Sequence, residues 1–106
     1  MTKTVTAVDN GTTIEVHPGD ELVVRLEENP TTGYRWQIDR IDGPLEPAGD
    51  SYELSAPGMI GGGGSHEFRF RATGPGTADL TLKHLRSWEG DASITQRFAV
   101  TVNVAG

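Results

Sequence analysis

The chain has 106 residues, a formal net charge of −6 at pH 7 and no cysteine. A chain of this length suits one domain that buries roughly 60–70% of the surface of its unfolded form. The absence of cysteine excludes a disulfide scaffold, a thiolate metal site and a cysteine nucleophile. The acidic balance, without a cluster of lysine and arginine, argues against nucleic acid as a partner.

No apolar run approaches the ~20 residues of a membrane-spanning helix. Residues 1–6 carry no apolar stretch of the kind found in secretory signals. We therefore expect either a cytoplasmic protein or the mature form of an exported one, without a membrane span. The expected oligomeric state is a monomer.

Short runs of alternating apolar and polar residues, separated by turn residues, predict strands along the whole chain. The first run opens at Val5 and ends at Asp9-Asn10-Gly11, which is typical of a hairpin turn. Asn10-Gly11-Thr12 also fits a glycosylation sequon, but the turn explains it without sugar. Residues 42–49, rich in proline, glycine and acidic side chains, predict an irregular connection. The other predicted strands are, in order, 12–16, 21–26, 34–39, 52–55, 65–72, 77–85 and 93–104.

Apolar residues do not recur at helical spacing for more than a turn. The pattern predicts an all-β protein, an immunoglobulin-like antiparallel β-sandwich of seven to eight strands, as a single domain over residues 1–106. Val23 and Arg25 are expected to point outward. The predicted core comprises Leu22, Val24, Trp36, Phe68, Phe70, Leu80, Leu82, Phe98 and Val100.

Enzymatic activity is not expected. The chain has no Gly-x-Ser-x-Gly elbow. Its three histidines, His17, His66 and His84, are scattered singly, which favours solvated or partly buried side chains over a catalytic base. Ligands at zinc spacing are missing, and the acidic residues between 46 and 53 lack the alternating pattern of a calcium loop. We expect no cofactor and no metal.

Three connections carry residues that a simple chain reversal does not need. The first is Asn29-Pro30-Thr31-Thr32-Gly33-Tyr34. Pro30 fixes its own φ near about −65°, and Gly33 permits a positive φ where the chain re-enters a strand. These residues predict a stiff, exposed turn with a fixed shape, although an ordinary β-turn would use the same residue types.

The second connection is the run Gly61-Gly62-Gly63-Gly64 before Ser65. A phosphate cradle would need a following helix, whereas Ser65 leads into a strand. A flexible linker would separate two folded units, whereas this run lies inside one sandwich. The remaining interpretation is a bare backbone that another chain approaches closely for main-chain pairing.

The third connection, residues 86–90, contains Arg86-Ser87-Trp88. A tryptophan among charged residues and glycine is expected to be exposed, and tryptophan and arginine are enriched at binding hot spots. The alternative is a tryptophan folded back over the end of the core. In an immunoglobulin-like sandwich alternate connections emerge at one end, so the three connections predict one contiguous protein-binding surface.

The same three segments, Asn29–Tyr34, Gly61–Gly64 and Arg86–Trp88, closely resemble the signature loops of chagasin-like inhibitors of papain-like cysteine peptidases. The resemblance spans nearly the whole chain and implies a reversible, competitive, tight-binding inhibitor. It implies that Thr31 and Thr32 enter the catalytic cleft, that the glycine run pairs along the non-primed side, and that Arg86 and Trp88 brace the primed side. Ser87 stands where the family usually has proline, which loosens the third loop.

The alternative function is a carbohydrate- or protein-binding adhesion-type β-sandwich module that uses Trp88 as a stacking platform. Such a module would favour further exposed aromatic side chains beside Trp88, and the three loops supply none.

Overall fold

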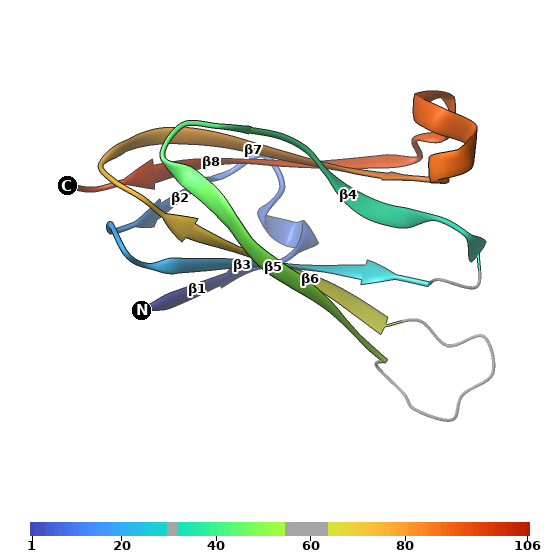
Figure 1. The fold of residues 1–106 in the computed structure, drawn as a ribbon, viewed down its shortest axis with the longest axis horizontal. Helices are drawn as coiled ribbons and strands as arrows, with labels where there is room; N and C mark the ends of the chain where they lie inside the picture. The colour runs from blue at the N-terminus through green and yellow to red at the C-terminus, as the bar shows by residue number, and fades with distance from the viewer. Residues whose placement is uncertain (30–31, 55–63) are drawn as a thin grey trace.

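The computed structural model describes residues 1–29, 32–54 and 64–106, which form a sandwich of two four-stranded sheets (Figure 1). The strand order is β1-β3-β6-β5 in one sheet and β2-β8-β7-β4 in the other. The strands are β1 (Thr2–Val5), β2 (Thr13–Val16), β3 (Glu21–Glu28), β4 (Arg35–Asp42), β5 (Leu45–Leu54), β6 (Gly64–Ala72), β7 (Gly76–Leu85) and β8 (Gln96–Val104).

Two short 3-10 turns complete the fold over the described residues, η1 (Ala7–Asp9) and η3 (Ser87–Ser93). None of the helical segments in these parts of the chain is long and apolar enough to cross a membrane. The predicted all-β sandwich is therefore confirmed, with η3 in place of the expected third loop.

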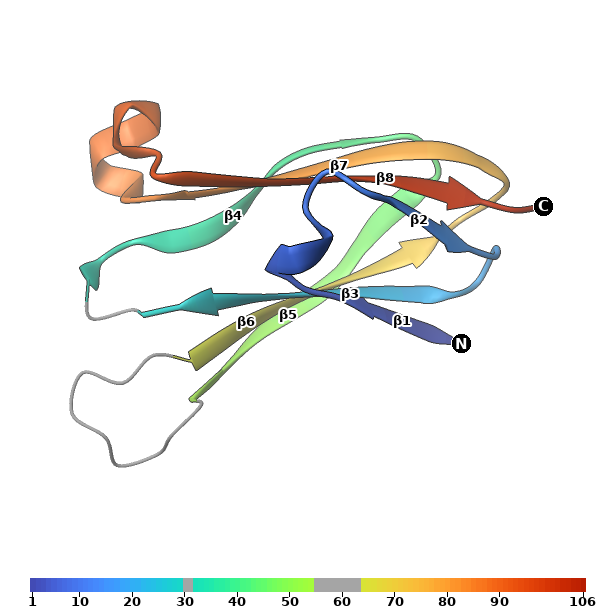
Figure 2. The same cartoon turned by 180° about the vertical axis from the view of Figure 1, so that it is seen from behind.

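The first connection differs from the predicted hairpin, because β1 and β2 belong to opposite sheets. Strand β1 ends at Val5, and η1 carries the chain across the open edge of the sandwich (Figure 2). The Asn10 carboxamide oxygen accepts the Ala99 N–H at 2.8 Å, and the Gly11 N–H donates to the Ala99 carbonyl at 2.7 Å. The Asn-Gly pair therefore docks the crossover on β8 instead of closing a hairpin, and the prediction of a hairpin was wrong.

This crossover makes two pairings parallel, those of β1 with β3 and of β2 with β8, while the others are antiparallel. Because the chain switches sheets there, each of these short strands runs alongside its partner in the same direction.

Residues 42–49 were predicted to be irregular, but β5 already begins at Leu45. It pairs with β6 along its whole length, with a bulge between Pro47 and Gly49, where Gly49 has a φ of 120°. Proline and glycine read as strand breakers in the sequence. They are tolerated here because β5 is an edge strand with one side unpaired, so a proline, which lacks an N–H, need not cost the sheet a hydrogen bond.

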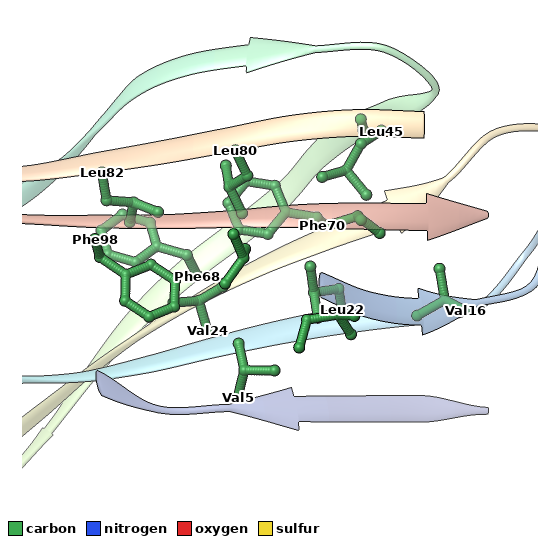
Figure 3. Close-up of a cluster of buried hydrophobic side chains, with 14 of the residues drawn as sticks. Val5, Val16, Leu22, Val24, Leu45, Phe68, Phe70, Leu80, Leu82 and Phe98 are labelled. Carbon is green, nitrogen blue, oxygen red and sulfur yellow. The ribbon is translucent and has the colours of Figure 1, made fainter. Parts of the chain in front are cut away.

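The core lies between the sheets, where the large side chains face one another (Figure 3). All nine predicted core residues are buried, and Phe70, Leu80 and Leu82 are fully inaccessible. Val23 points away from the core cluster as expected, yet it is only 6% exposed. Strand β3 lies between β1 and β6, so side chains of the flanking strands cover its outer face as well.

The segments that flank the three predicted loops lie at one end of the sandwich, opposite both termini (Figure 1). The end of β3 and the start of β4 flank the first loop, and η3 forms the third. The end of β5 and the start of β6 flank the glycine run. The shared end predicted from the order of the strands is confirmed for these flanking residues.

Candidate functional site

The described part of the predicted site comprises Asn29, Thr32, Gly33, Tyr34, Gly64, Arg86, Ser87 and Trp88. The remaining predicted site residues, Pro30, Thr31, Gly61, Gly62 and Gly63, lie outside the described residues.

The first turn is closed by Thr32. Its N–H and its hydroxyl both donate to the Asn29 carbonyl, at 3.2 Å and 2.8 Å, and the hydroxyl accepts the Tyr34 N–H at 3.3 Å. Gly33 follows with a φ of 80°, as the sequence predicted. A short hydroxyl side chain thus replaces water as the partner of the turn backbone, which favours one turn conformation.

The third segment is a compact 3-10 turn. The Ser93 hydroxyl accepts the Arg86 N–H at 3.0 Å and lies within donor distance of the Arg86 and Gly90 carbonyls. Gly90 has a φ of 71° and bends the turn in its middle. A bond of 2.9 Å between Lys83 and Asp91 ties the far side of the turn to β7. The salt bridge raises the pKa of Lys83 and lowers that of Asp91.

Trp88 and Arg86 join the first turn to the third segment. A Cβ built on Gly33 would lie 2.5 Å from the Trp88 ring, so the indole packs directly against the bare glycine backbone. The Arg86 Nε–H donates to the Thr32 carbonyl at 3.3 Å, and its guanidinium lies 4.5 Å from the centre of the Tyr34 ring. The glycine, the cation–π contact and the hydrogen bond make the two segments one surface.

Trp88 is 70% exposed even though one edge of its ring rests on Gly33. The predicted exposure of this tryptophan is confirmed. Trp36, which the alternation placed in the core, is 5% exposed, and its indole N–H donates to the Glu27 carbonyl at 3.0 Å. The two tryptophans therefore serve different purposes, one in packing and one on the surface.

Beneath this surface lies His84, whose importance the sequence analysis missed. Its ring stacks on Tyr34 with 5.5 Å between centroids and contacts Trp36 at 5.0 Å. Its Nδ1 lies 2.9 Å from the Thr95 hydroxyl. Burial lowers the pKa of the His84 imidazole, and the Glu28 carboxylate opposes that shift.

Glu28 was also missed. Its side chain is fully buried, and one carboxylate oxygen accepts the Trp36 N–H at 2.6 Å. The other oxygen lies 3.1 Å from His66 Nδ1, and His66 Nε2 in turn lies 2.6 Å from the Asp50 carboxylate. This cluster joins β3, β4, β5 and β6 at the bases of the first and second loops.

Gly64, the described residue of the glycine run, faces Glu28 across the β3–β6 ladder. The Tyr52 hydroxyl donates to the Glu28 carbonyl at 3.1 Å and would lie 2.6 Å from a Cβ on Gly64. Glycine is therefore needed at position 64 for close packing as well as for any exposed backbone.

A shared signal could have found Glu28, His66 and His84. Each lies on the inward face of its strand, the same face as the core residues two, four and six places away. In β3, for example, the alternation of Leu22, Val24 and Leu26 continues to Glu28. A titratable residue that continues a core alternation at the end of a strand indicates a polar network at that end of the core. Over the described residues, the acidic, histidine and cysteine side chains form no group able to hold a metal ion.

The chain resembles known proteins along nearly its whole length. The sequence model of the family described as "Chagasin family peptidase inhibitor I42" matches residues 15–102. Amoebiasin-1 of Entamoeba histolytica is 32% identical over 100 residues, which cover 94% of this chain and 97% of that protein. Chagasin of Trypanosoma cruzi is 30% identical over 107 residues, which cover 94% of this chain and 96% of that protein.

Among solved structures, the crystal structure of the cysteine protease inhibitor EhICP2 from Entamoeba histolytica matches with a TM-score of 0.86. The match covers 97% of this chain and 95% of that chain, at 23% sequence identity. A likeness at this identity speaks for the fold alone.

Proposed function

The chain belongs to the chagasin family of peptidase inhibitors, and we propose that it inhibits papain-like cysteine peptidases by blocking their active-site cleft. The blocking surface is made of residues 29–34, 61–64 and 86–90. It is an inhibitor and not an enzyme. The proposal assigns the tip of the first turn, Thr31 and Thr32, to the cleft itself. The glycine run pairs its backbone with the peptidase on one side, and Arg86 and Trp88 contact it on the other.

The observation that carries this proposal is the packing of Trp88 on Gly33. It leaves 70% of a tryptophan side chain exposed, yet fixes the ring through a contact and holds its neighbour Arg86 on Thr32 and Tyr34. A side chain that is both exposed and held in place loses little conformational freedom on binding, which favours tight association.

Ser87 supports the same arrangement despite replacing the proline that the family resemblance leads one to expect. Ser87 is the first residue of η3, a position that favours proline because its N–H needs no intrahelical partner. The bonds from Ser93 to Arg86 and Gly90 hold the turn closed without it. We therefore expect a working third loop.

The carbohydrate-binding alternative is not favoured. A stacking platform needs an open aromatic face, and the Tyr34 ring is already contacted by Arg86 and His84. Trp88 is then left without a second open ring beside it, which suits contact with a protein surface better than with a sugar.

The test is the inhibition constant for papain, measured with a fluorogenic peptide substrate for the wild type, Trp88→Ala and Val8→Ala. We expect Trp88→Ala to weaken inhibition by ~2 kcal/mol or more, about 30-fold, because it removes a central exposed anchor. Val8 is 88% exposed but belongs to η1, outside the three proposed loops, so Val8→Ala should leave inhibition unchanged. Equal inhibition by Trp88→Ala and the wild type would remove Trp88 from the interface.

A further inference from the structure

Four side chains, from the first loop, β4, β7 and the third segment, form a column under the proposed surface. The Arg86 guanidinium lies over one side of the Tyr34 ring, and the other contacts of Tyr34 include His84, which also touches Trp36. Trp36 and His84 are cross-strand partners in the β4–β7 ladder. The column therefore rests on the core at one end and reaches the binding surface at the other.

His84 is the only ring of the column that changes charge near neutral pH, because histidine titrates between about pH 5 and 8. Thr95, which directly precedes the neighbouring strand β8, holds His84 as well: its hydroxyl lies 2.9 Å from Nδ1 of the ring, and its N–H donates to the His84 carbonyl at 2.9 Å. A change of charge on His84 therefore acts on a ring that cannot simply swing into solvent.

The groups around His84 set the sign of the effect. Burial lowers the pKa of the imidazole, so the neutral ring is the form that the folded protein favours, while the Glu28 carboxylate on β3 opposes this. Glu28 is itself engaged by Trp36 and by His66 on β6. Toward the surface, the other charge in the column is the Arg86 guanidinium, which contacts the same Tyr34 ring as His84 and therefore repels an imidazolium there.

We propose that His84 is a positioning residue of the inhibitory surface: its neutral ring supports Tyr34 and so holds Arg86 on Thr32, and its protonation loosens that contact and weakens inhibition. The inference rests on the proposed function and adds to it a dependence on pH that is built into this chain. Arg86 acts on the first turn directly, through the Thr32 carbonyl, whereas His84 acts through Tyr34.

The test compares wild type, His84→Phe, His84→Ala and the control His17→Gln as inhibitors of papain at pH 7.5, 6.5, 5.5 and 5.0. Phenylalanine keeps an aromatic ring that cannot be protonated. The ratio of two inhibition constants at one pH cancels the titration of the enzyme. His17 is an exposed histidine paired with Asp20, at the turn before β3 and far from the site.

We expect His84→Ala to weaken inhibition at pH 7.5 and His84→Phe to restore it. Between pH 7.5 and 5.0, wild type should lose affinity relative to His84→Phe by about five-fold or more, the lower end of typical coupling between two sites. His17→Gln should follow the wild type. Parallel pH profiles for wild type and His84→Phe would overturn the proposal.

A second readout needs no peptidase. In nuclear magnetic resonance spectra of the wild type, the Arg86 Nε–H and the Thr32 amide should shift with the same midpoint as the His84 ring, and these shifts should vanish in His84→Phe. If the wild type fails to inhibit papain at every pH, the proposed function is wrong, and these resonances alone decide the coupling. Resonances of Arg86 and Thr32 that ignore the titration of His84 would refute it.

Discussion

Replacement of Glu28 by alanine tests the polar network on which two of the three loops rest. Glu28 has a fully buried side chain that accepts the Trp36 N–H and contacts His66. Its removal leaves the Trp36 donor and the His66 ring without their partner. An orphaned buried polar group costs about 1–3 kcal/mol, and here two such groups lose the same partner.

We therefore expect Glu28→Ala to lower the free energy of unfolding by about 2–6 kcal/mol, a large share of the 5–15 kcal/mol typical of a domain. The midpoint of thermal unfolding should fall by on the order of 15–25 °C. Glu28→Gln keeps an acceptor oxygen for the Trp36 N–H but turns an amide toward His66, so we expect a smaller loss of about 1–3 kcal/mol.

The assay is urea unfolding followed by tryptophan fluorescence, with Glu27→Gln as the matched control. Glu27 is the adjacent residue of β3, but its side chain is exposed on the other face, so its substitution should change stability by no more than about 0.5 kcal/mol. A loss of less than about 1 kcal/mol for Glu28→Ala would refute the argument that this carboxylate holds β3, β4 and β6 together.

Three further predictions follow from the site. Gly33→Ala should weaken papain inhibition far more than Gly19→Ala. Both glycines have a positive φ, near 80° and 89°, but only at Gly33 would a Cβ strike Trp88. Similar losses for both variants, in matched inhibition assays, would contradict the packing. Ser87→Pro should improve inhibition by about 0.4–1 kcal/mol by fixing the start of η3, and a weaker inhibitor would show that the turn needs the serine. Burial lowers the pKa of His84 in the folded state, so the neutral imidazole's contribution to the free energy of unfolding is full above the unfolded-state pKa of about 6.5 and is lost as the pH falls below that pKa. Urea unfolding of the wild type and His84→Phe at pH 7.5 and 5.0 measures this loss. An equal change in stability for both proteins would contradict the assignment to His84.

The alternation of the sequence predicted the core correctly because a period of two is fixed by strand geometry and needs no knowledge of the partner strand. Phe68, Phe70, Leu80 and Leu82 all lie where that pattern placed them. The pattern failed where the position of a strand in its sheet decides which residues the strand can contain. Pro47 reads as a strand breaker in any sequence, but an edge strand accepts it.

The binding surface was predictable in part, because its motifs are local in sequence. Gly33 and Trp88 could each be singled out from their neighbours, but the contact between them joins the first loop to η3 and depends on the fold. Glu28 and His84 were missed. Glu28 lay beyond the predicted strand 21–26, and His84 was interpreted only as a solvated or partly buried histidine, whereas both occupy inward positions near strand ends.

The most direct test of the inhibitor assignment is the rate of papain as a function of inhibitor and substrate concentration. An interface of standard size, ~1,600 Å², is compatible with a dissociation constant of about 1 nM, and blockage of the cleft predicts that substrate competes with the inhibitor. We expect tight, reversible inhibition whose apparent constant rises linearly with substrate concentration. Full papain activity at micromolar concentrations of folded protein, or inhibition that substrate does not relieve, would contradict the account.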